Sequence, residues 1–189
     1  MPGLLVTRFD RLPRPDDVPA LLAVEDACQA LGLWPADKYA PSAETVVTAL
    51  SAMTPAPAVA ARDAFRQIVF ALLTGNGDVH AKNLSVLADP SGEFRLSPAY
   101  DLPSTVPYGD TSLALSLQGR KSGISRRILL DFAEAIGLRR VAAERALEQL
   151  LTATADLAEA IHAGVLLFGA GDIAKTVKQL ADRRRLLAA

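Results

Sequence analysis

Hydrophobic residues recur at helical spacing along much of the chain, most regularly between residues 59 and 73. The apolar positions of this segment fall at i, i+3, i+4, i+7 and i+8, the spacing of one buried helical face: Phe65, Ile68, Val69, Leu72 and Leu73. The pattern predicts a helix that ends in the turn-forming run 75–78 (GNGD).

Capping residues and glycines predict further helices. Ser42 is expected to cap a short helix that reaches Met53, and Ser125 a helix that ends at Gly137. Three more helices are predicted from apolar patterns between breakers: 20–31, 141–163, and a last one that follows Gly169 and Gly171 and closes with the arginines 183–185.

Short apolar segments predict a few strands. Residues 84–87 and 93–96 flank the turn 89–92 (DPSG) and predict a β-hairpin. A strand is also expected from Leu4 to Phe9, before prolines at 13, 15 and 19 interrupt regular structure. No internal repeat is found, so the chain is predicted to be one helix-rich domain that carries a small hairpin.

Composition narrows the function classes. The 189 residues carry 20 Lys+Arg against 21 Asp+Glu, so no overall charge draws the chain to nucleic acid or to a membrane. One cysteine and two histidines exclude an internal disulfide and a Cys/His zinc cage. No apolar run is long enough to cross a bilayer and no signal peptide is found. We expect a cytoplasmic protein with no membrane partner and no direct nucleic-acid binding.

Two polar loops beside the predicted hairpin carry the candidate chemistry. They are residues 75–83 and 97–102, and they bring Asp78, Asn83 and Asp101 to the same end of the hairpin. Two carboxylates and an amide oxygen suit Mg²⁺, whose shell is normally completed by water and substrate phosphates. The Asp-x-x-x-x-Asn step equals that of protein-kinase catalytic loops, although such residues also cap turns.

The ordered set of motifs resembles one family. Segment 75–85 (GNGDVHAKNLS) closely resembles the catalytic loop of HipA-type serine/threonine kinases, the toxin half of a bacterial toxin-antitoxin pair, and 96–101 (LSPAYD) resembles their metal-binding segment. Further similar segments are the hinge strand at 5–11, the next helix at 25–32, and the later segments 113–119 and 124–138. The resemblance covers nearly the whole chain.

The resemblance implies a mainly α, protein-kinase-like C-terminal lobe. Its parts would be a hinge strand (1–11), helices (12–74), catalytic and metal-binding loops around a hairpin (75–105), and a helical remainder (106–189).

The resemblance also assigns roles to single residues. Asp78 would orient or deprotonate the substrate hydroxyl, and Asn83 with Asp101 would coordinate Mg²⁺. His80 would either touch the transferring phosphate or brace the loop. Lys82 would pair with phosphate or with Asp78, or be an exposed lysine without a role.

The ATP site is assigned in the same way. The backbone of Thr7 and Phe9 would meet the adenine at the hinge, and Tyr100 is placed in the nucleotide site with them. A complete kinase of this type needs a glycine-rich loop and a Lys–Glu pair that precede the hinge, so the resemblance covers the C-terminal lobe only. The family's usual glycine-containing loop after Lys38 and Tyr39 is replaced by 40–43 (APSA).

Two functions therefore stay open. The first is Mg-ATP-dependent phosphotransfer to a protein serine or threonine, with the N-lobe supplied by a separate chain or a longer protein. The resemblance suggests a translation component as its substrate and an antitoxin-like partner. The second is a truncated, inactive pseudokinase that serves as a partner-binding module. Asp78 and His80 also have metallohydrolase spacing, but two histidines are too few for such a centre.

Overall fold

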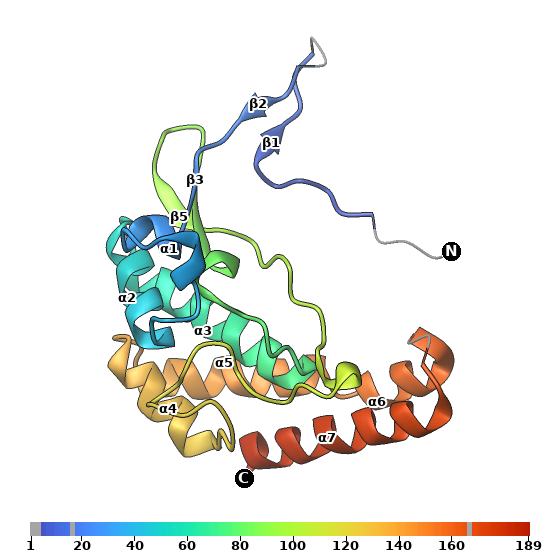
Figure 1. The fold of residues 1–189 in the computed structure, drawn as a ribbon. Helices are drawn as coiled ribbons and strands as arrows, with labels where there is room; N and C mark the ends of the chain where they lie inside the picture. The colour runs from blue at the N-terminus through green and yellow to red at the C-terminus, as the bar shows by residue number, and fades with distance from the viewer. Residues whose placement is uncertain (1–4, 16–17, 166–167) are drawn as a thin grey trace.

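Helix α3 (Pro57–Thr74) runs through the centre of the fold and contacts other elements on several sides. The structure, a computed structural model, describes residues 5–15, 18–165 and 168–189. Figure 1 shows the helices that pack against α3: α2 (Ala43–Ala52), α5 (Arg140–Ala153) and α7 (Ala170–Ala188). The expected helix-rich lobe with a small β-hairpin is confirmed.

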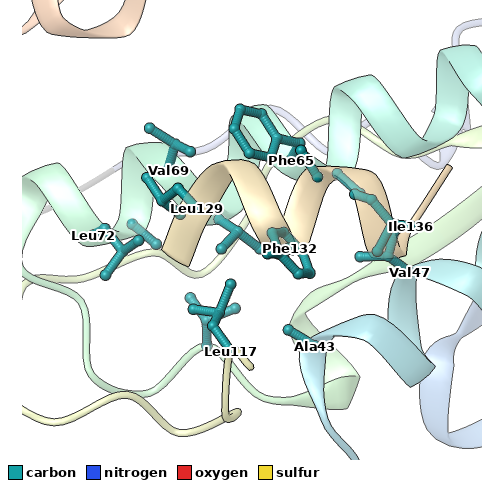
Figure 2. Close-up of a cluster of buried hydrophobic side chains, with 14 of the residues drawn as sticks. Ala43, Val47, Phe65, Val69, Leu72, Leu117, Leu129, Phe132 and Ile136 are labelled. Carbon is teal, nitrogen blue, oxygen red and sulfur yellow. The ribbon is translucent and has the colours of Figure 1, made fainter. Parts of the chain in front are cut away.

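Helix α4 (Arg126–Ala135) completes the hydrophobic core. Its Phe132 ring stacks on Phe65 of α3, with ring centroids 6.1 Å apart, and both side chains are fully buried. Figure 2 shows Leu129 and Phe132 of α4 in the same cluster as Val47 of α2 and Leu117. The apolar face that the sequence predicted for α3 is therefore the face that holds the helices together.

Local capping signals place the helix ends where the sequence predicted them. The Ser42 hydroxyl accepts a hydrogen bond from the Thr45 N–H at 3.2 Å, and α2 begins there. Ser125 caps α4 in the same way. Gly75 ends α3 with φ of 78°, and a Cβ at this position would lie 2.6 Å from Val106 Cγ2, so glycine is required there.

The predicted hairpin is present, and it is part of a three-stranded sheet in the order β3-β4-β5. Strand β4 (Ser85–Ala88) pairs antiparallel with β5 (Phe94–Leu96) and, on its other side, with β3 (Val24–Asp26). The helix expected over 20–31 is wrong, because this segment first forms strands and only then the short helix α1 (Ala27–Ala30).

A capping box explains where α1 begins. The Asp26 carboxylate accepts from the Gln29 N–H at 3.0 Å, and the Gln29 side chain accepts from the Asp26 N–H at 2.9 Å. Residues before Asp26 are committed to the β3–β4 ladder, which satisfies their backbone groups outside a helix. Tertiary pairing therefore overrides the helical propensity of the segment.

The N-terminal hinge strand is also corrected. Leu4 lies outside the described residues, residues 5–8 have no regular secondary structure, and residues 9–10 form a turn. The ladder begins only afterwards, where β1 (Arg11–Leu12) pairs antiparallel with β2 (Ala20–Leu21). Leu5 is 98% exposed, because no strand within the described part of the chain pairs with this segment.

The helix expected over 141–163 is broken into pieces. Helix α5 ends at Ala153, and α6 (Leu157–Ala160) continues into a π-helical turn (Ile161–Val165). At the end of α5 the Leu150 carbonyl accepts two hydrogen bonds from Thr154, one from its hydroxyl at 2.8 Å and one from its N–H at 3.0 Å.

Helix α7 closes the molecule against α3. The Arg183 guanidinium donates to the Leu72 carbonyl at 3.3 Å and to the Thr111 carbonyl at 2.6 Å. Arg184 donates to the Leu151 carbonyl near the end of α5 at 2.6 Å. Two of these bonds go to carbonyls in the last turns of α3 and α5, where cationic side chains are favourable. Among the described residues, no helix is both long and apolar enough to cross a bilayer.

Candidate active site

A hydrogen-bonded pair joins the two polar loops. The Asn83 Nδ2 donates to Asp101 Oδ2 at 2.8 Å, and Asn83 Oδ1 accepts from the His80 N–H at 3.0 Å. Asn83 belongs to the 3₁₀ turn η2 (Ala81–Asn83) that leads into β4, whereas Asp101 follows β5. The hairpin therefore brings together two of the three residues that the sequence predicted to converge.

Asp101 is held in an unusual backbone conformation. Its φ is 52°, in the left-handed region that residues other than glycine seldom adopt. Such strained positions persist where the surrounding structure fixes them, and they concentrate at functional sites. This conformation is a second observation, independent of the hydrogen bond, that marks Asp101 as a candidate functional residue.

Asp78 is an exposed residue between buried neighbours. Its N–H donates to the Asn76 side-chain oxygen at 2.7 Å, which fixes the backbone after the end of α3. Its carboxylate oxygen Oδ1 accepts a hydrogen bond from the Tyr39 hydroxyl at 2.8 Å. No hydrogen bond joins Asp78 directly to Asn83 or Asp101 within the described residues.

The pKa of the His80 imidazole is affected by its burial and by the charges of Lys38, Asp78 and Asp101. Burial lowers the pKa of its imidazole below the ordinary 6.5 and Lys38 acts in the same direction, while the weaker effects of Asp78 and Asp101 oppose them. The ring is 6% exposed, and the Tyr39 ring meets it edge-on at 5.2 Å. Its Nδ1 has no hydrogen-bond partner among the described residues. Both predicted roles, loop bracing and phosphate contact, remain predictions.

Lys82 has a partner that the sequence analysis did not consider. Its Nζ donates to Asp26 Oδ2 at 2.5 Å, and this hydrogen bond raises the pKa of Lys82. Of the alternatives predicted for Lys82, contact with phosphate stays a prediction, and pairing with Asp78 is not seen because Asp26 holds the ammonium group. The cause is the strand register, because Asp26 lies opposite Ser85, and so beside the turn that carries Lys82.

Of the three residues assigned to the nucleotide site, Tyr100 and Phe9 contact each other, whereas Thr7 is hydrogen-bonded to neither. The Tyr100 ring lies 5.6 Å from the Phe9 ring, and its hydroxyl donates to the Lys82 carbonyl at 2.6 Å. A second contact joins this hydroxyl to Ser85 Oγ at 2.5 Å, and burial raises the pKa of Tyr100. Thr7 is exposed and forms no hydrogen bond with any described residue.

Tyr39 and Asp26 are the site residues that sequence reasoning missed. Asp26 had a local signal, because Asp followed three positions later by Gln is typical of a capping box. Tyr39 had none, since its contact with Asp78 spans 39 residues of sequence. Both act on the catalytic loop from the segment that precedes α2.

Asn83 and Asp101 form a donor set whose chemistry suits Mg²⁺. They offer the hard oxygen ligands that Mg²⁺ prefers, and Asp101 Oδ1 has no hydrogen-bond partner in the described ranges. In those ranges no three His, Cys, Asp or Glu side chains gather as a metal-binding group. A bound Mg²⁺ would therefore need phosphate oxygens and water to complete its shell.

Comparison with known proteins gives consistent matches. The family model described as HipA-like C-terminal domain matches residues 1–158. The putative kinase Y4mE of Sinorhizobium fredii is 35% identical over 147 residues, which are 76% of this chain and 34% of that protein. The serine/threonine-protein kinase toxin HipA of Shewanella oneidensis is 32% identical over 157 residues, 73% of this chain and 36% of that protein.

A solved structure shares the fold. It is the complex of HipA, HipB and operator DNA from the toxin-antitoxin system of Shewanella oneidensis, and the TM-score is 0.74 at 28% sequence identity. The match covers 96% of this chain and 48% of that chain. The present chain thus spans about a third of the length of the curated relatives it matches.

Proposed function

Because the chain belongs to the HipA-like C-terminal domain family, we propose that it is the catalytic lobe of an ATP-dependent protein serine/threonine kinase. The observation that carries the proposal is the hydrogen bond between Asn83 and Asp101, which joins the catalytic and metal-binding segments at one end of the hairpin. The order and spacing of Asp78, Asn83 and Asp101 support the same assignment.

The proposed chemistry divides among three residues. Asp78 orients the serine or threonine hydroxyl of the substrate and takes its proton as the oxygen attacks the γ-phosphorus of ATP. The bond to the bridging oxygen breaks and ADP leaves. Asn83 and Asp101 would hold Mg²⁺, which would neutralise charge on the phosphates. The Tyr100 and Phe9 rings, 5.6 Å apart, offer an apolar surface for the adenine.

Other parts of the reaction would come from outside this lobe. Kinases use a glycine-rich loop and a Lys–Glu pair to hold the nucleotide phosphates, and we propose that these belong to a longer protein or a separate chain. The solved relative is a complex with HipB and operator DNA, which supports an antitoxin-like protein as partner. A translation component remains our proposal for the phosphorylated substrate.

The test is the thermal midpoint of the purified chain with and without Mg-ATP. A ligand at one hundred times its Kd adds about 2.7 kcal/mol, which corresponds to roughly 5 to 10 °C for a domain of this size. We expect a shift that requires Mg²⁺ and is lost in Asp101→Asn. Asp172→Asn, an exposed carboxylate on α7, is the matched control and should keep the shift.

Either result is informative. A magnesium-dependent shift that disappears only in Asp101→Asn supports the metal–nucleotide site. No shift at millimolar Mg-ATP contradicts a stand-alone kinase that binds the nucleotide with this lobe only, and it favours the alternative of a partner-binding module without transferase activity.

A further inference from the structure

Tyr39 contacts the candidate catalytic aspartate from outside the catalytic loop. Its hydroxyl donates to Asp78 Oδ1 at 2.8 Å, and Tyr39 is 44% exposed, so this contact lies at the surface of the protein. No other described residue donates a hydrogen bond to the Asp78 carboxylate. Because Asp78 itself is exposed, packing alone does not fix its side-chain conformation.

The backbone holds Tyr39 against the catalytic loop. The carbonyl of Lys38 accepts a hydrogen bond from the N–H of Ala81, the residue after His80, at 3.1 Å. The Tyr39 ring then meets His80 edge-on at 5.2 Å, and Lys38 Nζ lies 4.9 Å from the ring centroid. Three separate contacts therefore place the phenol hydroxyl, and its position does not depend on the hydrogen bond to Asp78 alone.

A carboxylate has two oxygens and can accept several hydrogen bonds at once. The phenol occupies Oδ1, which leaves Oδ2 to accept the hydrogen bond of a substrate hydroxyl. We propose that Tyr39 is a positioning residue for phosphotransfer, which fixes Asp78 through Oδ1 so that Oδ2 faces the incoming serine or threonine. This inference deepens the proposed kinase function and rests on it.

The mechanism predicts what removing a single hydroxyl does. In Tyr39→Phe the ring and its contact with His80 are kept, while Asp78 loses its hydrogen-bond donor. Asp78 then samples several rotamers, and only a fraction of encounters present Oδ2 to the substrate. The cost falls on the chemical step, because neither nucleotide nor metal binding is assigned to Tyr39.

The first measurement reads the conformation of Asp78 without requiring activity. The Hα–Hβ NMR couplings of Asp78 in the 189-residue chain should show one fixed rotamer in wild type and averaged values in Tyr39→Phe. Tyr108→Phe, which removes the hydroxyl of a tyrosine that is 78% exposed, is the control and should leave the couplings unchanged. Couplings that do not change in Tyr39→Phe overturn the proposal.

The second measurement follows phosphate transfer from Mg-ATP to casein, a generic serine acceptor, by the lobe together with the longer protein or separate chain that supplies the glycine-rich loop and the Lys–Glu pair. We expect Tyr39→Phe to lower kcat about tenfold, the effect of one hydrogen bond to a charged group, with KM for ATP within about twofold of wild type. In an Asp78→Asn background the same change should cost nothing further, because Tyr39 acts through Asp78.

Several outcomes of these measurements would contradict the proposed role of Tyr39. An unchanged or raised kcat in Tyr39→Phe overturns the proposal, since a raised rate means that the phenol competes with the substrate hydroxyl. An equal loss in the Asp78→Asn background shows a general structural role and also overturns it. If the couplings change as expected but wild type, joined to the part that supplies the glycine-rich loop and the Lys–Glu pair, transfers no phosphate, the kinase function has failed, and the positioning role of Tyr39 in phosphotransfer falls with it.

Discussion

The burial of the His80 side chain should make the free energy of unfolding depend on pH. Burial holds the pKa of its imidazole below 6.5, with Lys38 acting in the same direction and Asp78 and Asp101 opposing. Between the lowered folded pKa and 6.5, the unfolded chain binds a proton that the folded chain does not. The free energy of unfolding therefore falls as pH drops through this window.

The expected outcome is a difference between two histidine variants. Thermal midpoints measured from about pH 7.5 to about pH 5.5 should fall less in His80→Gln than in wild type, because the buried imidazole is gone. His162→Gln, a change at an exposed histidine, should keep the wild-type dependence. A His80→Gln profile parallel to that of wild type would show that another group causes the acid sensitivity.

Among the elements, those with local signals were predictable and those made by distant pairing were not. Helices α2, α3 and α4 have caps and an apolar face within their own sequence, so their positions agree with the prediction. Strand β3 exists because β4 pairs with it across about sixty residues of sequence, which a helix-like apolar pattern does not reveal.

The residues of the candidate site also divide into those with a local sequence signal and those placed by distant pairing. The order of Asp78, Asn83 and Asp101 could be recognised in the sequence, because the hairpin between the two loops has a local turn signal. The Asp26 partner of Lys82 could not, because it depends on the β3–β4 register.

Asp26 makes two stabilising contacts, one at the start of α1 and one with Lys82, and two substitutions can separate their contributions to stability. It caps α1 through Oδ1 and holds Lys82 through Oδ2. Asp26→Asn keeps a capping oxygen but loses the charge, and the Lys82 side chain is 39% exposed, so we expect a cost below about 1 kcal/mol.

Asp26→Ala should cost about 1 kcal/mol more than Asp26→Asn, because the cap is lost as well. Urea unfolding of both variants measures the difference. Equal costs would mean that the cap contributes nothing and that the Lys82 contact accounts for the whole effect.

For the whole molecule, α7 is an integral part of the core although it lies beyond residue 158, where the family match ends. Its Leu187 is 1% exposed and belongs to the same buried cluster as Leu72 of α3, and Arg183 bonds to the Leu72 carbonyl. The end of α3 leads directly into the loop that carries Asp78. Helix α7 therefore stabilises the part of the fold from which the candidate active site extends.

Two adjacent leucines on α7 test this role. Leu187→Ala should lower the free energy of unfolding by about 2 to 5 kcal/mol, the usual cost of a cavity in a packed core. Leu186→Ala, next to it but 47% exposed, should change it by no more than about 0.5 kcal/mol. Urea unfolding compares them directly. If the two costs were equal, α7 would not be packed in the core, and the segment beyond the family match would be an appendage to a fold that is complete without it.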